Sequence, residues 1–169
     1  MCIRDRTSEQ TLYEMTNRDS SQIISVASSK SQEHTILRDS ILPGLLENLS
    51  KNIHETYPQK FFESGIVFSK GSPIKEIANL ACVTASEETN VSEMKAILQS
   101  LLRIGFSIKC ETKALSSHAL FSQGRVAEII INRKTVGYIG ELDSKVLENF
   151  RIRTKVVGFE IKLSGLIFD

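Results

Sequence analysis

The sequence has few cysteines, no long apolar run and no excess of either charge. Its three cysteines, Cys2, Cys82 and Cys110, are scattered and form no CxxC pair, which favours a reducing compartment over a disulfide framework. No apolar run approaches the ~20 residues needed to span a bilayer, and the first residues lack the apolar region of a signal peptide. Lys and Arg number 21 against 20 Asp and Glu, a net charge of +1, which predicts no broad attraction to nucleic acid or membrane. We therefore expect a cytoplasmic protein without a membrane partner.

The sequence also carries none of the short motifs that build common catalytic or metal sites. Its histidines and cysteines show no close ligand pairs, so we expect no metal site and interpret the histidines as solvated or hydrogen-bonded surface residues. No GxSxG nucleophile elbow occurs, and neither GxGxxG nor GxxxxGK is present to hold phosphate. We therefore expect no catalytic, cofactor-binding or metal-binding residue in this chain.

Length and composition predict one soluble globular domain. The chain has 169 residues, of which 41% are hydrophobic and 24% charged, and these values disfavour both disorder and a coiled coil. We expect a poorly defined N-terminal segment over residues 1–19, with a possible cloning or assembly scar at 1–6. The domain itself is expected over residues 20–169.

A first segment with the apolar period of a helix covers residues 40–55. Asp39 or Ser40 is expected to cap its start, Pro43 falls in the first turn, and Gly44 leaves room for another backbone to approach closely. The apolar stripe comprises Leu42, Leu45, Leu46, Leu49 and Ile53.

A second helix is predicted from Asn90, which forms a capping box with Glu93, to Gly105, which is expected to end it. A short third helix is predicted over residues 144–150. Both segments show apolar residues at helical spacing.

Strand patterns fill most of the remaining sequence. They cover residues 23–26, 60–69, 77–85, 106–111, 127–131, 136–141 and 157–163. The segment 60–69 is apolar on both faces, so we expect it to be central in the sheet and covered on both sides. Residues 132–135 are typical of a hairpin connection. Because hairpins dominate and no βαβ rhythm repeats, we predict an α+β fold in which helices flank an antiparallel sheet.

Two carboxylates, Glu63 and Glu141, stand within two residues of a glycine in these apolar strands. A charge in such a place must be paired or hydrogen-bonded, and Arg38 and Arg125 are candidate partners. Structural pairing is the favoured interpretation, and a role in binding a ligand is the alternative.

Five segments, taken in order, resemble one family. They are residues 35–46 (TILRDSILPGLL), 58–65 (PQKFFESG), 124–127 (GRVA), 136–150 (VGYIGELDSKVLENF) and 157–161 (VGFEI). They are similar to the C-terminal catalytic-like module of phenylalanine–tRNA ligase β subunits, and they resemble the archaeal and eukaryotic type more than the bacterial type. Each segment alone is weak evidence. Five segments in the same order and at similar separations, which cover about residues 20–163, are strong evidence.

The resemblance implies a fold like that of class II aminoacyl-tRNA synthetases and a module that has lost the catalytic motifs. It implies packing against an α subunit that binds ATP and phenylalanine, in an (αβ)₂ heterotetramer. ATP and Mg²⁺ then belong to the holoenzyme, and tRNA(Phe) is expected nearby in the complex. The residues that match family motifs or are candidates for the subunit interface are Arg38, Leu42, Pro43, Gly44, Leu46, Glu63, Gly65, Gly124, Arg125, Gly140 and Glu141.

The sequence departs from the family pattern in places. Ser28-Ser29 stand where Asn-Pro is usual, Asp143-Ser144-Lys145 lacks the usual proline, and no arginine-rich motif occurs near residues 155–169. The alternative function is a freestanding paralogue that binds an amino acid or tRNA in a pocket lined by residues such as Glu63, Arg125 and Glu141. An independent ligase is disfavoured, since the ATP motifs are missing.

Overall fold

A six-stranded sheet forms the centre of the computed structural model, which describes residues 5–21, 23–26, 35–164 and 166. All neighbouring strands of this sheet pair in antiparallel fashion. Across the sheet, the order is β3 (Gln59–Ser69), β4 (Lys75–Ala85), β8 (Val156–Lys162), β7 (Lys134–Leu142), β6 (Phe121–Ile131) and β5 (Glu111–Leu115). The predicted α+β class with an antiparallel sheet is confirmed.

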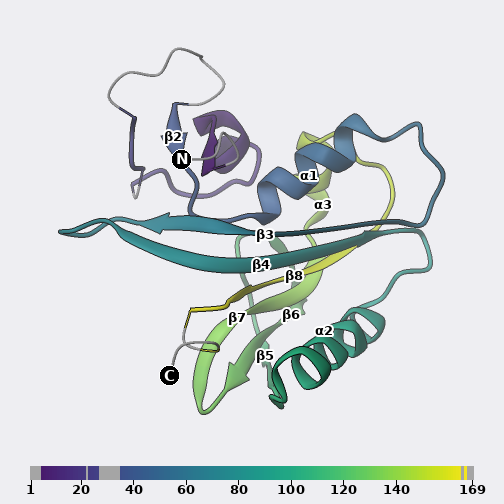
Figure 1. Cartoon of the computed structure of the whole chain (residues 1–169). Coiled ribbons are helices and arrows are strands. Elements are labelled where there is room, and N and C mark those ends of the chain that lie inside the picture. Colours follow the sequence, from purple (N-terminus) through teal and green to yellow (C-terminus); the bar gives the residue numbers. More distant parts are fainter. Residues whose placement is uncertain (1–4, 22, 27–34, 165, 167–169) are drawn as a thin grey trace.

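Helices lie on both faces of this sheet. α1 (Leu42–Lys51) and α3 (Ser144–Asn149) lie on one face, and α2 (Val91–Phe106) lies on the other (Figure 1). Alternate residues of each strand point to opposite faces, so Phe159 of β8 packs in the layer beneath α2 whereas Glu160 reaches α1. The apolar core is therefore divided into two layers by the sheet.

The N-terminal residues form a small layer on the α1 side of the sheet (Figure 1). β1 (Arg6–Thr7) pairs with β2 (Ile36–Leu37), and the π-helix η2 (Gln10–Glu14) packs against α1. Leu12 and Tyr13 of η2 are buried.

The strand expected over residues 23–26 is reduced to a single bridge between Ser25 and Ile36. Its partner β2 is only two residues long, so there is little strand to pair with. The departure noted at Ser28-Ser29 lies outside the described residues.

The first predicted helix is shorter than expected at both ends. α1 begins at Leu42 and ends at Lys51, with Pro43 in its first turn as predicted. No side chain immediately before the helix accepts a hydrogen bond from its first turn, so the local cap predicted at Asp39 or Ser40 is wrong. The start of the helix is instead held by a residue from the far end of the chain.

The prediction that residues 60–69 form a central strand is wrong. β3 is the outermost strand, next to β4 alone in the sheet, and Phe62 is 78% exposed. Aromatic residues on both faces imitate the pattern of a doubly covered strand. Because α2 packs on β7 and β8, Phe62 on the same face is left open.

α2 is capped as predicted but ends later. The side chain of Asn90 accepts a hydrogen bond from the backbone N–H of Glu93 at 2.9 Å. The helix continues through Gly105 and ends where Ser107 adopts a left-handed conformation with φ 57°. The strand predicted over residues 106–111 is therefore wrong, since β5 begins only at Glu111.

The predicted hairpin connection is confirmed. Asn132 and Arg133 join β6 to β7, with φ values of 50° and 64°. Positive φ at both central residues is typical of the two-residue turn whose twist matches that of paired strands.

Replacing Gly140 with Ala is expected to lower the free energy of unfolding by about 1–3 kcal/mol. A Cβ at residue 140 would lie 2.6 Å from the backbone oxygen of Arg125. The same replacement at Gly105 in α2 is expected to raise it by about 0.5–1 kcal/mol, since nothing lies within 4 Å of the added carbon. Urea unfolding measures both, and equal effects would contradict the packing of β6 on β7.

Candidate functional site

The carboxylate of Glu160, in β8, holds the start of α1. It accepts hydrogen bonds from the backbone N–H of Ile41 at 3.0 Å and of Leu42 at 3.1 Å. It also accepts from the hydroxyl of Ser40 at 2.7 Å and from the amide of Asn79 on β4 at 2.6 Å. The first N–H groups of a helix have no partner within it and carry partial positive charge, so an anion is favoured there. A distant strand thus supplies the cap that the adjacent sequence does not.

Asp39 makes a second polar contact on the same face. Its carboxylate accepts hydrogen bonds from the guanidinium of Arg18 and from the hydroxyl of Tyr13 at 3.2 Å. The guanidinium also lies over the ring of Tyr13, 5.2 Å from its centroid. Burial, followed by the charge of Asp39, raises the pKa of Tyr13 to about 12, so this phenol keeps its proton.

A cavity of about 170 Å³ lies beside these groups. Its polar lining consists of Arg18, Asp39, Ser40, Asn79, His118, Tyr138, Glu160 and Lys162. The His118 ring packs 4.4 Å from that of Tyr138 and 5.2 Å from that of Phe121, between centroids. The cavity therefore combines charged groups with an aromatic wall.

His118 corrects the prediction that the histidines are surface residues. It is half-buried, and its Nδ1 accepts a hydrogen bond from the backbone N–H of Leu120 at 3.3 Å. Burial lowers the pKa of His118, and the charge of Arg18 lowers it further, so the ring is neutral at neutral pH. His54 is exposed as predicted, and His34 lies outside the described residues.

Glu63 pairs with Arg38, one of the two candidate partners proposed from the sequence. Nη1 of Arg38 lies 2.6 Å from Oε1 of Glu63, and their side chains are 7% and 12% exposed. Nε of Arg38 also donates to the carbonyl of Ile66 at 3.0 Å, and Nη2 lies 3.7 Å from Asp5. A Cβ at Gly65 would collide with the guanidinium, so the glycine makes room for the pair.

Glu141 pairs with Arg125 in the same way but nearer the surface. Nη1 of Arg125 lies 2.7 Å from Oε2 of Glu141, and the arginine side chain is 61% exposed. Gly124 beside it has φ 73°, which favours glycine, and Gly140 permits close contact with the backbone of Arg125.

The candidates on α1 are mostly interior. Leu42, Pro43 and Leu46 are buried in the core of this chain, so they are not available to a partner. Gly44 is partly exposed, and no atom lies within 4 Å of the position of an added Cβ.

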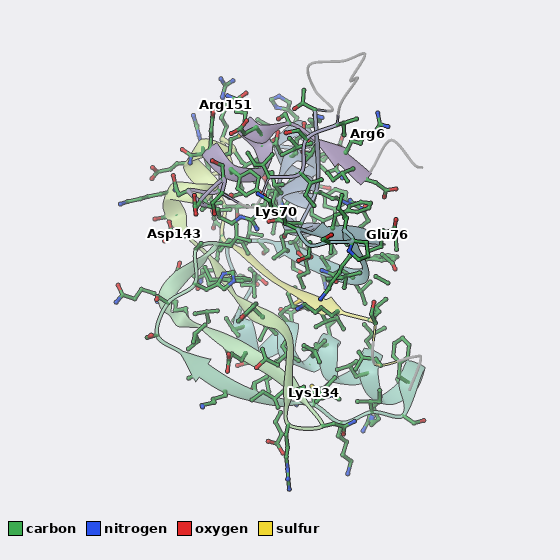
Figure 2. All side chains as sticks on the ribbon, turned by 90° about the vertical axis from the view of Figure 1, so that its left-hand side faces the viewer. Arg6, Lys70, Glu76, Lys134, Asp143 and Arg151 are labelled. Atoms are coloured by element: carbon green, nitrogen blue, oxygen red, sulfur yellow. The ribbon has the colours of Figure 1, made fainter. Side chains whose placement is uncertain are left out.

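The residues chosen from the sequence fall in three places, on α1 and at the two ion pairs, and do not form one site. Residues lining the cavity, such as Glu160, His118 and Tyr138, were missed. In the sequence, Glu160 and Lys162 alternate with apolar residues of a predicted strand. A solvated strand face shows the same alternation, so nothing singled out Glu160. Other charged side chains are dispersed: Figure 2 shows Lys134 at one end of the molecule and Arg6 and Arg151 at the opposite end.

In the part of the chain that the structure describes, no three His, Cys, Asp or Glu side chains gather closely enough to hold a metal ion. Among the described helices, none combines the length and the apolar character needed to cross a membrane.

The fold matches that of a solved aminoacyl-tRNA synthetase. The structure of Desulfitobacterium hafniense PylSc, a pyrrolysyl tRNA synthetase, is similar with a TM-score of 0.73, over 96% of this chain and 59% of that chain. At 17% sequence identity, this likeness concerns the fold alone. The sheet and its flanking helices thus have the class II aminoacyl-tRNA synthetase fold.

Sequence relatives identify the family within that class. The family described as "Phenylalanyl tRNA synthetase beta chain CLM domain" matches residues 5–163. Phenylalanine–tRNA ligase beta subunits of Pyrococcus abyssi and Archaeoglobus fulgidus are 37% and 38% identical over 95% and 96% of this chain. The chain spans 29% of the length of each of these relatives. It belongs to the phenylalanyl tRNA synthetase beta chain CLM domain family, and the resemblance seen in the sequence is confirmed.

Replacing Glu160 with Ala is expected to lower the free energy of unfolding by about 3–5 kcal/mol, because several donors lose a charged acceptor. Formate is expected to restore part of this loss, since a helix start accepts a free anion. Chemical unfolding with and without formate measures both effects. The exposed Glu148 on α3 supplies the control, and Glu148→Ala should change stability by less than about 0.5 kcal/mol. Equal stability of the two variants would contradict the role of Glu160.

Replacing Glu63 with Gln is expected to lower the free energy of unfolding by about 3 kcal/mol, because the buried guanidinium of Arg38 loses its closest counter-charge. Glu141→Gln removes the matching carboxylate from the exposed pair and should change it by less than about 1 kcal/mol. Calorimetric melting of both variants tests this. A larger loss for Glu141→Gln would overturn the assignment of the buried pair.

Proposed function

We propose that this chain is a non-catalytic structural module of a phenylalanine–tRNA ligase β subunit. In this role, it packs against the α subunit of an (αβ)₂ holoenzyme and supports the ATP-dependent attachment of phenylalanine to tRNA(Phe). The holoenzyme is cytoplasmic, and tRNA(Phe) lies near the module. Support comes from the family match over residues 5–163 and from relatives named as β subunits of this ligase.

The observation that carries the non-catalytic role is that most of the charged groups described above are already engaged. Glu160 is bound by the start of α1, Arg38 pairs with Glu63, and Arg125 pairs with Glu141. A group that exchanges protons or binds a reacting substrate needs a free donor or acceptor. These residues stabilise the fold and have little capacity left for chemistry.

ATP and Mg²⁺ are proposed to bind to the α subunit rather than to this chain. Phosphate groups need free Arg or Lys side chains, and Mg²⁺ needs carboxylate oxygens. Arg38 is buried with Glu63, and the carboxylate of Glu160 is fully engaged by Ser40, Asn79 and the helix start. Neither Arg38 nor Glu160 is therefore available to a nucleotide with its metal ion.

The contact with the α subunit is proposed to use exposed apolar residues outside the stripe of α1. Phe62 of β3 and Ile104 of α2 are each 78% exposed, and Ile74 and Tyr57 are 47% and 43% exposed. Large apolar side chains in water are typical of a surface that a partner covers.

The alternative of a freestanding binding protein has weaker support. It rested on a pocket formed by Glu63, Arg125 and Glu141. The structure places these residues in two separate ion pairs, and none of them lines the cavity on the α1 face.

The chain is expected to elute together with its cognate α subunit when both are mixed at about 10 μM, a concentration well above the dissociation constant of a stable complex. Size-exclusion chromatography with light scattering checks this. Phe62→Ser and Ile104→Ser alter equally exposed residues on β3 and α2. The variant that elutes to a smaller extent with the α subunit therefore identifies the element in contact with it. Two separate peaks for the unaltered chains would contradict the proposal.

A further inference from the structure

The acids that line the cavity on the α1 face are engaged by groups of the chain. Asp39 accepts hydrogen bonds from Arg18 and Tyr13. Glu160 accepts from the start of α1, from Ser40 and from Asn79. Neither carboxylate is therefore available to a positively charged ligand, and the charge of Arg18 is balanced by Asp39.

Most groups of this cavity that lack a polar partner among the described residues are donors, although the Oδ1 of Asn79 is a buried acceptor that is also left free. Among the described residues, none accepts a hydrogen bond or forms an ion pair with the ammonium of Lys162 or the hydroxyl of Tyr138. The Nδ1 of His118 accepts from the backbone of Leu120, so the proton of the neutral ring is on Nε2, which can donate. The lining carries two positive charges, on Arg18 and Lys162, and two negative charges, on Asp39 and Glu160. Of these four groups, Lys162 is the one without a hydrogen bond or ion pair to a described residue.

Strand register places these donors together. Tyr138 lies opposite Glu160 in the pairing of β7 with β8, and Lys162 lies opposite Asn79 in the pairing of β8 with β4. Side chains at positions 160 and 162 point to the same face of the sheet. The ammonium and the phenol hydroxyl thus come from neighbouring strands of one face, beside the same cavity.

The remaining wall is aromatic and apolar. The ring of His118 packs at a tilt against those of Tyr138 and Phe121, and the buried Leu120 also lines the cavity. The cavity of about 170 Å³ matches the size of engineered cavities of ~150 Å³ that hold a benzene ring. The cavity is therefore large enough for a planar ring, whereas a simple inorganic ion would leave part of it empty.

We propose that this cavity binds a small aromatic carboxylate. The ring packs against His118 and Tyr138, and the carboxylate accepts hydrogen bonds from the ammonium of Lys162 and the hydroxyl of Tyr138. This site is independent of the packing against an α subunit and needs no catalytic step.

The test uses 4-fluorobenzoate, observed by fluorine NMR as it is titrated into the full chain. Saturable line broadening is expected, with a dissociation constant of about 1 mM. The matched neutral probe, 4-fluorobenzamide, should bind at least about tenfold more weakly, because it cannot form the charge-assisted hydrogen bond. Inorganic phosphate should displace the ring compound only at about tenfold higher concentration, because it lacks the apolar body.

Three variants locate the site. Lys162→Gln and Tyr138→Phe should weaken 4-fluorobenzoate binding, by about tenfold and about threefold, and Lys145→Gln on α3 makes the same charge change away from the cavity and should leave it unaltered. Circular dichroism confirms that each variant is folded. The proposal is overturned if saturation is absent up to about 20 mM, if the benzamide or phosphate binds as well as the benzoate, or if Lys162→Gln has no effect.

Discussion

The hydrogen bonds of Glu160 connect the middle of the sheet to the start of α1. Because the donors include two backbone N–H groups of the helix and a side chain of β4, one carboxylate fixes three elements relative to one another. The leucines of α1 then lie over the sheet and form the core layer of that face. The position of this layer, and of the cavity at its edge, therefore depends on a carboxylate from β8, the last strand of the described residues.

Charge in this domain follows two different patterns on one face of the sheet. Asp39, Glu63 and Glu160 each contact a guanidinium, a hydroxyl or the backbone, which compensates for the loss of hydration. Two donor groups beside the cavity, the ammonium of Lys162 and the hydroxyl of Tyr138, have in contrast no polar partner among the described residues. Around this cavity, the carboxylates are therefore held in place by several donors, whereas Lys162 and Tyr138 are not.

The elements with local signals were predictable from the sequence. The apolar period of α1 and α2, the cap at Asn90 and the turn at Asn132 and Arg133 each depend on neighbouring residues. The two ion pairs were also predictable, since an acid near a glycine in an apolar strand needs a partner. Local patterns could not show the order of the strands in the sheet, and β3 was therefore predicted to be central. They also could not show the role of Glu160, because its partners at the start of α1 lie about 120 residues away along the chain.

The place of β3 at the margin of the sheet has a consequence for any longer protein that contains this domain. This outermost strand of 11 residues has one long side that pairs with no strand of the described residues. Arg38 engages one part of it, since its carbonyl accepts from the backbone N–H of Phe68 and its Nε donates to the carbonyl of Ile66. Such a margin is a template on which a further strand, from the same polypeptide or another, adds by main-chain hydrogen bonding alone. Phe62 is exposed beside this edge, so the edge must be covered if the protein is not to self-associate at high concentration.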